Sequence, residues 1–411
     1  MVVETVVVAP ERTVAVLAFV AAGCLFGTVS GLVPGLHANN MAFLLAALAP
    51  SIPGSPPLVG AAMLAAGVVH SFLDIAPMLA LGVPDPAMAV SALPGHRLVL
   101  EGRGREALCL SALGSGLAVV LSVPLAVPLT VVMVGAEPVI STHQPLVLGA
   151  IVLALLGTEP TRRGIGGGVL AFAASAGLGI VALDLPTNPA LAVGSVLTPL
   201  FTGLFGAPVL IDAMEGNGIP EQRGGTVTLS ARSVCGLGGV GSLCGAIVGY
   251  IPGVSSAIAA TLALVTVPGR YGARGFVVAT SGVNTANTIF ALFALVSLGA
   301  PRTGVLVALK RANVPIDLPL LLAAVVIAAV VGFCAVLSLG DPYLRLVGAI
   351  DYTTLSIGVL GLLCLVSYLF AGLIGIGVFA ASTVVGLLPV RLDVQRAHLM
   401  GVLLGPLILG Q

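Results

Sequence analysis

The stretch Gly31-Leu-Val-Pro34-Gly35 decides how this chain is organised, because it recurs 218 residues later as Gly249-Tyr-Ile-Pro252-Gly253. Each copy ends one long hydrophobic segment and begins another. Proline removes a backbone donor and glycine loosens the backbone, so we predict a broken helix at both places. At membrane depth, broken backbone persists only where protein buries it or where it lines a cavity. Paired breaks at matching points of two halves indicate a transporter's binding site.

The composition defines the class of protein. Of 411 residues, 58% are hydrophobic and only 8% are charged, whereas a soluble protein carries about 25% charged residues. Apolar runs of about 20 residues, the length of a transmembrane helix, recur along the whole chain. We therefore predict an all-α, polytopic protein of the cell membrane. The net charge is zero and no basic stripe is present, so nucleic acid is not an expected partner.

The apolar runs predict fourteen helical segments, of which 37–50 and 254–268 are short enough to be half-helices or re-entrant segments. Counting such pieces as parts of broken spans gives roughly 10–12 transmembrane helices. The segment Met1 to Arg12 lacks the features of a cleaved secretory signal, so we expect the first helix to be retained. The predicted segments are 13–33, 37–50, 57–81, 106–134, 144–157, 164–183, 190–212, 232–251, 254–268, 275–299, 317–339, 354–370, 372–388 and 397–410.

The two halves of the chain repeat, and we divide them into a first transmembrane repeat, 1–215, and a second, 216–411. The polar stretch from Asp212 to Arg232 is the natural joint between them. Further on, Gly82-x-Pro84 matches Gly299-x-Pro301 at an offset of 217. At the constant offset of 218, the matching positions are Gly23, Gly27, Gly31, Pro34, Gly35 and Ala42 with Gly241, Gly245, Gly249, Pro252, Gly253 and Ala260.

The orientation of the repeats is left open by the charges. The basic loop 97–105 and the pair Arg162 and Arg163 read as cytoplasmic by the positive-inside rule. Basic residues at 302–311 occupy the loop equivalent to 97–105 and favour parallel repeats, whereas Arg270 and Arg274 do not fit that arrangement.

Polar residues follow both Pro-Gly pairs and form the first part of a candidate site. His37, Asn39 and Asn40 follow the first pair, and Ser255 and Ser256 follow the second. If a helix restarts at each place, its N-terminus offers unpaired N–H groups and a partial positive charge, which hold anions such as carboxylate or phosphate. The alternative is that the Asn and Ser side chains only cap the helices.

A second polar group lies inside the predicted spans. His70 and Asp74 are four residues apart, hence on one helical face, and the repeat aligns His70 with Asn287, one turn after Asn284. Ionisable residues within a span are costly and are candidates for function. We expect His70 and Asp74 to sense a coupling proton or sodium ion, with Asp85 joining them if its loop folds inward. The alternatives are hydrogen bonding between helices and, for Asp85, a turn residue.

The motifs of several enzyme classes are absent from the sequence. There is no HExxH, no GxSxG and no Walker A motif, and the six cysteines stand singly without a CxxC. We therefore expect no catalytic residue, no bound metal and no cofactor.

The duplicated motifs and the run Leu93-Pro-Gly-His-x5-Gly-x-Gly-Arg-Glu-Ala107 resemble the TctA family, the large membrane subunit of tripartite tricarboxylate transporters. The likeness extends over most of the chain and looks closest to a shorter, archaeal-type branch. The resemblance implies ion-driven uptake of small carboxylates, together with a small membrane subunit and a solute-binding protein. The family's two conserved motifs fall on Gly31, Pro34 and Gly35 and on Gly249, Pro252 and Gly253.

Two functions remain open for this fold. The first is a secondary-active transporter of small organic anions, which works alone or with partner subunits. The second is a carrier of polyprenyl phosphate or another anionic lipid, because Pro252-Gly-Val-Ser-Ser256 is similar to a run in such carriers and a helix end binds phosphate equally well. An intramembrane hydrolase is a third possibility and predicts a stoichiometric metal.

Overall fold

The computed structural model describes residues 10–34, 41–42, 45–46, 51–81, 92–190, 195–214, 219–251, 256, 259–260, 263 and 266–410. Within these ranges the chain is helical and contains no strand. Eight helices are long and apolar enough to cross a membrane, and three shorter apolar helices accompany them. The prediction of an all-α polytopic membrane protein is confirmed.

The helices of the first half are α1 (Pro10–Leu32), α3 (Pro56–Leu73), α4 (Ile75–Leu81), α5 (Ala92–Leu100), α6 (Gly104–Thr142), α7 (Gln144–Gly157), α8 (Arg162–Ala182), α9 (Leu197–Phe201), η3 (Thr202–Gly206) and α10 (Ala207–Ala213). Those of the second half are α11 (Ala231–Tyr250), η4 (Gly269–Tyr271), α13 (Gly272–Leu298), α14 (Gly304–Arg311), α15 (Leu318–Ala349), α16 (Tyr352–Leu392), η5 (Arg396–Met400) and α17 (Gly401–Ile408).

Two helices continue well beyond their predicted ends. Helix α6 runs to Thr142, not 134, although it contains Pro124, Pro128 and Pro138, and α15 runs to Ala349, not 339. Membrane helices tolerate such prolines because neighbouring groups satisfy the freed carbonyls. In α16, by contrast, the predicted interruption near residue 371 is present, since Gly372 has a φ of 65° inside the helix. A Cβ atom there would overlap the carbonyl oxygen of Asn188, so only glycine fits.

Two parallel helix pairs, one in each half, carry the repeated glycine positions. Along α1 and α3, Gly23 lies against Ala62, and Gly31 lies against His70 and Leu73. Along α11 and α13, Gly241 lies against Ala279 and Gly249 against Phe290, which are the matching positions. A Cβ atom at Gly23 or Gly241 would overlap the facing carbonyl oxygen, so glycine is required for this close approach. The same contact is thus built twice, although the boundary between 1–215 and 216–411 itself remains a prediction.

The two pairs are antiparallel to each other. Three contacts along α3 and α4 show this. Gly67 contacts Val305, and further along the chain Asp74 is hydrogen-bonded to Asn284. Beyond it, Met78 and Leu79 lie with Val277 around Gly95 of α5. The partners on the second half therefore descend in number while the first half ascends. Because α3 and α13 are equivalent helices running in opposite directions, the two repeats are inverted.

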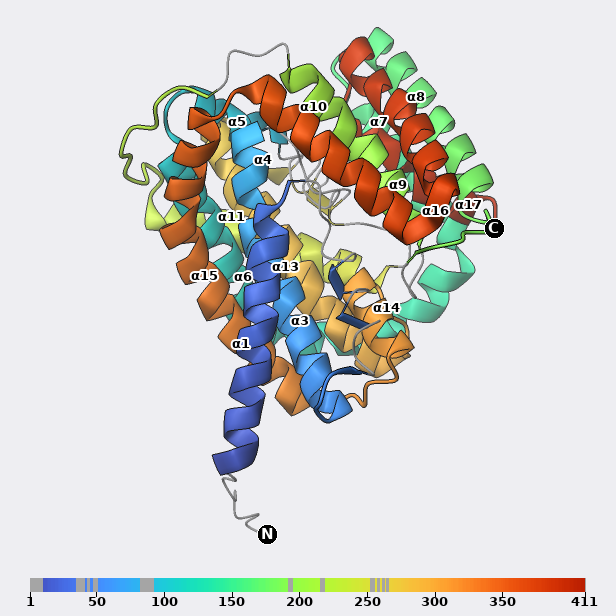
Figure 1. Cartoon of the computed structure of the whole chain (residues 1–411). Helices are drawn as coiled ribbons and strands as arrows, with labels where there is room; N and C mark the ends of the chain where they lie inside the picture. Colours follow the sequence, from blue (N-terminus) through green and yellow to red (C-terminus); the bar gives the residue numbers. More distant parts are fainter. Residues whose placement is uncertain are drawn as a thin grey trace.

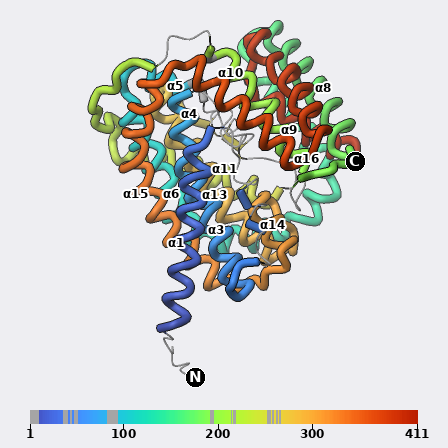
Figure 2. The backbone as a smooth tube through the Cα atoms, viewed as in Figure 1, coloured from blue at the N-terminus to red at the C-terminus, as the bar shows by residue number. Residues whose placement is uncertain are grey.

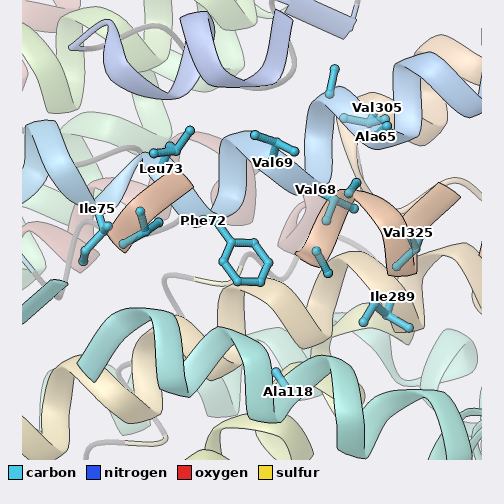
Figure 3. Packing of buried hydrophobic residues seen from close by; sticks show 14 of the residues in the cluster. Ala65, Val68, Val69, Phe72, Leu73, Ile75, Ala118, Ile289, Val305 and Val325 are labelled. Atoms are coloured by element: carbon cyan, nitrogen blue, oxygen red, sulfur yellow. The ribbon is translucent and has the colours of Figure 1, made fainter. Parts of the chain in front are cut away.

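In each half, one long helix that follows the pair, α6 in the first half and α15 in the second, packs on the helix pair of the other half. Gly114 of α6 lies against Val278 of α13, and Ser111 bonds Ser281 through their hydroxyls at 2.8 Å. Reciprocally, Gly332 of α15 lies against Phe72 of α3. Figure 3 shows this core, in which Val305, Val325 and Ile289 from three second-half helices gather around α3. The halves interlock, so neither packs as a separate body.

In a second bundle, helices of one half again pack on helices of the other half (Figures 1 and 2). The run Phe172-Ala-Ala-Ser175 of α8 recurs in α16 as Phe379-Ala-Ala-Ser382. Phe172 and Ser175 lie against Gly401 of α17, whereas Phe379 and Ser382 lie against Gly203 of η3. Each of these long helices therefore contacts the last short helices of the opposite half, and a separate hydrophobic cluster joins them.

A buried carboxylate establishes which loops share a membrane face. Glu106 is fully buried and pairs with Arg103 at 2.6 Å and with Arg274 at 3.0 Å. The loops that carry these arginines therefore lie on one face, which we call the basic face. Arg302 and Lys310 follow the opposite end of α13. The positive-inside rule predicts that the basic face is cytoplasmic. Inverted repeats place Arg270 and Arg274 on this face, which parallel repeats did not, and they place Arg302 and Lys310 on the opposite one.

Candidate functional site

The crossing of α3 and α13 joins the two halves through a buried polar contact. The Asn284 side-chain N–H donates to a carboxylate oxygen of Asp74 over 3.1 Å. Asp74 is 5% exposed and Asn284 7%, so both lie inside the bundle. Asp74 also stands between α3 and α4, where it caps α3 with a bond from its backbone N–H to the His70 carbonyl. An ionisable group at such a helix junction, bonded across two inverted repeats, is well placed to respond to an ion.

His70 lies one turn before Asp74 and is held by α1. Its Nδ1 is 2.9 Å from the hydroxyl oxygen of Ser30, and both residues are almost completely buried. The Ser30 oxygen is also 3.2 Å from the Gly27 carbonyl, to which its hydroxyl donates. Ser30 and His70 are therefore hydrogen-bonded across α1 and α3, with the direction of the bond set by the tautomer of His70.

The described ends of α1 and α11 lie beside this crossing. Helix α1 ends at Leu32, level with Leu73, and α11 ends at Tyr250, level with Phe290. Phe290 is six residues beyond Asn284, about 9 Å along the helix axis. Since the two pairs are antiparallel, α1 and α11 approach the crossing from opposite membrane faces. Both helices end within two residues of their Pro-Gly pair, where proline can no longer donate.

The structure places only some of the predicted site residues. Gly31 and Gly249 are buried at the helix ends, Pro34 is half-buried in the turn after α1, and Ser256 is 4% exposed. Asn287 is half-buried on α13, one turn after Asn284. Of these residues, Asp74 and Asn284 are hydrogen-bonded to each other, and His70 and Asn287 each lie one helical turn away, on α3 and α13. The predicted residues Gly35, His37, Asn39, Asn40, Asp85, Pro252, Gly253 and Ser255 lie outside the described residues.

Two polar residues near the crossing were not predicted. Ser30 contacts His70, and the Thr130 hydroxyl of α6 bonds the Tyr250 hydroxyl at the end of α11. The signal for Ser30 is its place in the glycine stripe Gly23, Gly27, Gly31, on the face that meets α3. For Thr130 there is no such signal, since the contact depends on how α6 crosses to the other half.

His96 shows how burial changes a histidine at the membrane boundary. Its Nδ1 is 2.7 Å from the Leu79 carbonyl oxygen, to which it donates. Burial lowers the pKa of His96, and the bond to Leu79 offsets part of this effect. Within the described residues, no group of three or more His, Cys, Asp or Glu side chains is placed to hold a metal ion.

The inverted repeats, the interlocked helices and the buried polar crossing define a polytopic membrane protein of the transporter type. Residues 17–401 match the model of the tripartite tricarboxylate transporter TctA family, so this chain belongs to that family. The resemblance inferred from the motifs is confirmed. The family indicates a component of a tricarboxylate transporter rather than an enzyme, and it does not favour a lipid carrier.

A related protein is found in an archaeon. An uncharacterized protein of Methanocaldococcus jannaschii is 28% identical over 404 residues, which cover 96% of this chain and 98% of that protein. The likeness agrees with the archaeal-type branch to which the motifs pointed. No solved structure matches the chain.

Proposed function

We propose that this chain is an ion-coupled secondary transporter of small carboxylates, with its site at the crossing of α3 and α13. The observation that carries the proposal is the buried bond between Asp74 and Asn284, which joins the two inverted repeats beside the ends of α1 and α11. Transporters with inverted repeats bind their cargo at the repeat interface, where helices are interrupted.

His70 and Asp74 take the ion-coupling role in this proposal. Asp74 supplies a buried carboxylate, and the C-terminal ends of α1 and α11 add carbonyl groups whose partial negative charge favours a cation. His70, hydrogen-bonded to Ser30, is the second ionisable side chain of the pair. The coupling ion is a proton or a sodium ion, and Asp85 is a further candidate.

The carboxylate is bound by amides and hydroxyls in this proposal. Asn284 and Asn287 line the crossing, and the segments that follow Pro34 and Pro252 add donors if helices restart there. Support comes from the TctA family, whose description names tricarboxylates. The same description suggests partners, namely a small membrane subunit and a solute-binding protein.

Uptake by proteoliposomes tests the proposal. The purified chain is reconstituted with and without candidate partner subunits, and labelled mono-, di- and tricarboxylates are offered while pH and sodium gradients are varied separately. We expect gradient-dependent uptake of a small carboxylate that unlabelled carboxylates reduce and lipid phosphates leave unchanged. Inhibition by lipid phosphates with no effect of carboxylates would contradict the proposed substrate.

A further inference from the structure

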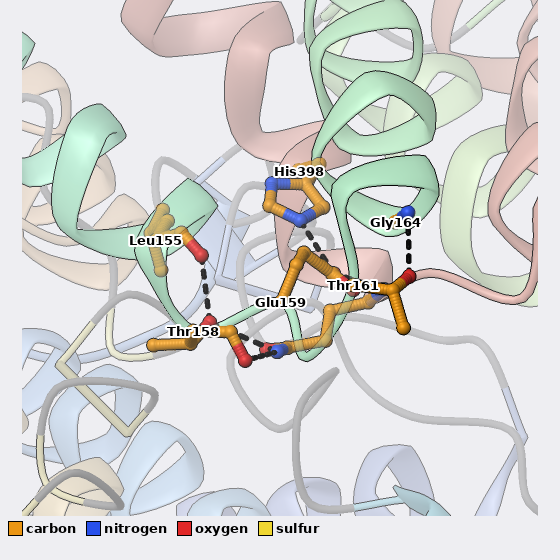
Figure 4. Close-up of polar contacts among 7 residues, drawn as sticks. Leu155, Thr158, Glu159, Thr161, Gly164 and His398 are labelled. Atoms are coloured by element: carbon orange, nitrogen blue, oxygen red, sulfur yellow. Dashed lines mark hydrogen bonds and ion pairs between the residues drawn. The ribbon is translucent and has the colours of Figure 1, made fainter.

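A buried contact between a carboxylate and an imidazole, which the proposed function does not use, lies in the second bundle (Figure 4). The Nε2 of His398, in η5, is 2.8 Å from Oε1 of Glu159, in the turn after α7. The two side chains are 1% and 2% exposed, and the Gln395 backbone N–H donates to the same oxygen over 2.9 Å. Burying two ionisable groups inside a membrane bundle costs free energy, so the two side chains are candidates for a function.

The pair lies at a joint between the halves of the chain. On the first-half side, the Ser175 hydroxyl of α8 donates to the His398 carbonyl over 3.3 Å, and Ser175 is fully buried. On the second-half side, Gln395 donates from its side chain to the Thr158 hydroxyl over 2.9 Å. Together with Gly401, these contacts hold η5 and α17 on α8.

The inverted repeat supplies a matching joint with different chemistry. There, Ser382 of α16 lies against Gly203 of η3, and the described polar contacts are made by uncharged groups. The Ser195 N–H donates to the Phe370 carbonyl over 3.0 Å, and the Thr202 hydroxyl lies 3.5 Å from that of Ser367. A carboxylate and a histidine therefore occupy one of two otherwise equivalent joints.

Other charges around the pair lie at the surface or have their own partner. Arg162 and Arg163 begin α8 and are exposed, as are Arg391 and Asp393 at the end of α16. Arg396 of η5 is half-buried two residues before His398, and the charge of Asp212 on α10 favours its charged form. In the described part of α7 and α17 there is no Asp, Glu, Lys, Arg or His. Glu159 and His398 are thus the titratable groups inside the joint.

We propose that Glu159 and His398 form a proton-binding site that controls how firmly η5 and α17 are held on α8. Histidine is the side chain that gains and loses a proton between pH 5 and 8. Protonated His398 makes a charge-assisted bond to the Glu159 carboxylate, which is roughly twice as strong as the bond made by neutral imidazole. When pH rises, the proton passes to bulk water and the joint loosens. This inference goes beyond the transport function and does not depend on it.

Thiol labelling measures the joint directly. Ser175→Cys and Ser382→Cys are made separately in a chain whose six native cysteines are replaced by serine, and reaction with N-ethylmaleimide is followed from pH 6 to pH 8.5. Both serines are fully buried at equivalent positions. The ratio of their labelling rates therefore removes the intrinsic effect of pH on thiol reactivity.

The ratio of the Ser175→Cys rate to the Ser382→Cys rate is expected to rise about fivefold over this range, given the difference between a charge-assisted and a neutral bond. With His398→Gln, which keeps an N–H donor but does not titrate, the ratio should become independent of pH. With His143→Gln, at an exposed histidine that bonds only the Val139 carbonyl, the rise should persist. A pH-independent ratio in the unaltered joint overturns the proposal, as does an undiminished rise in His398→Gln. The first of these results needs no histidine variant to fold.

Discussion

Ser30 and His70 are two buried residues whose side chains hydrogen-bond to each other between α1 and α3. The serine oxygen is 2.9 Å from Nδ1 of the imidazole, and neither side chain reaches solvent in the described structure. A buried polar group that loses its hydrogen-bond partner keeps the free-energy cost of its desolvation without the bond that offset it. The sequence identifies His70 because a histidine within an apolar span is unusual, whereas the signal for Ser30 is only its place beside the glycine stripe that meets α3.

Replacing Ser30 by alanine should therefore weaken the protein and change the behaviour of His70. We expect Ser30→Ala to lower the free energy of unfolding by about 1 kcal/mol, the net contribution of a typical buried hydrogen bond. The pH profile of carboxylate uptake should shift as well, and Ser30→Thr should restore it. Ser338→Ala, at an exposed serine that bonds only its own helix, serves as the control. An unchanged pH profile in Ser30→Ala would remove Ser30 from the coupling site.

His96 predicts a pH dependence of stability outside the crossing. Burial lowers its folded-state pKa, so the folded protein releases a proton more readily than the unfolded chain. The free energy of unfolding is therefore highest above the unfolded-state pKa of about 6.5. It decreases as pH falls through that value toward the folded-state pKa, because the unfolded chain then binds more protons than the folded protein. Thermal unfolding in detergent between pH 8 and pH 5 measures it. In His96→Asn this part of the loss should disappear, and an identical loss in both proteins would contradict it.

Helices α1, α3, α11 and α13 were foreseen from hydropathy, and their glycine positions from the repeat. The interlocking of α6 and α15 was not, because apolar helices show no preference for one apolar neighbour over another in sequence alone. For the same reason, the joint of Glu159 and His398 was missed. These residues are 239 apart in the chain and form no spacing motif.

The contact between α11 and α13 depends on a missing side chain at Gly241. We expect Gly241→Ala to destabilise the protein by about 1–3 kcal/mol, because the added Cβ would overlap the Ala279 carbonyl oxygen. Gly239→Ala, two residues earlier in the same helix, faces open space and should be neutral or slightly stabilising, as alanine is the better helix former. Melting temperatures in detergent compare the two. Equal effects would show that the close approach is not needed.

At the scale of the whole molecule, the inverted repeat fixes the orientation that the charges alone left open. Arg103 and Arg274 share Glu106, so two basic loops from different halves lie on one face. The sequence could not bring these loops together, because the direction of α13 relative to α3 appears only in their contacts. With that face cytoplasmic, as the positive-inside rule predicts, we expect helix α14, which carries Lys310, to lie outside the cell.

Cysteine labelling of intact cells tests this topology. In a cysteine-free chain, Lys310→Cys should react with a membrane-impermeant maleimide, whereas Arg223→Cys, on the basic face, should react only after the membrane is opened. Both side chains are exposed. Reaction of both residues in intact cells, or of Arg223→Cys alone, would refute the inverted arrangement or its orientation.

The crossing of α3 and α13 is the centre of the proposed transport cycle, and Asp74 is its one buried carboxylate within the described residues. Gradient-driven uptake by Asp74→Asn tests it most directly, compared with Asp184→Asn, whose side chain is exposed after α8. Loss of a charged buried partner should reduce uptake about tenfold or more in Asp74→Asn, while Asp184→Asn transports normally. Uptake by a folded, membrane-inserted Asp74→Asn at the unaltered rate would contradict the placement of the site.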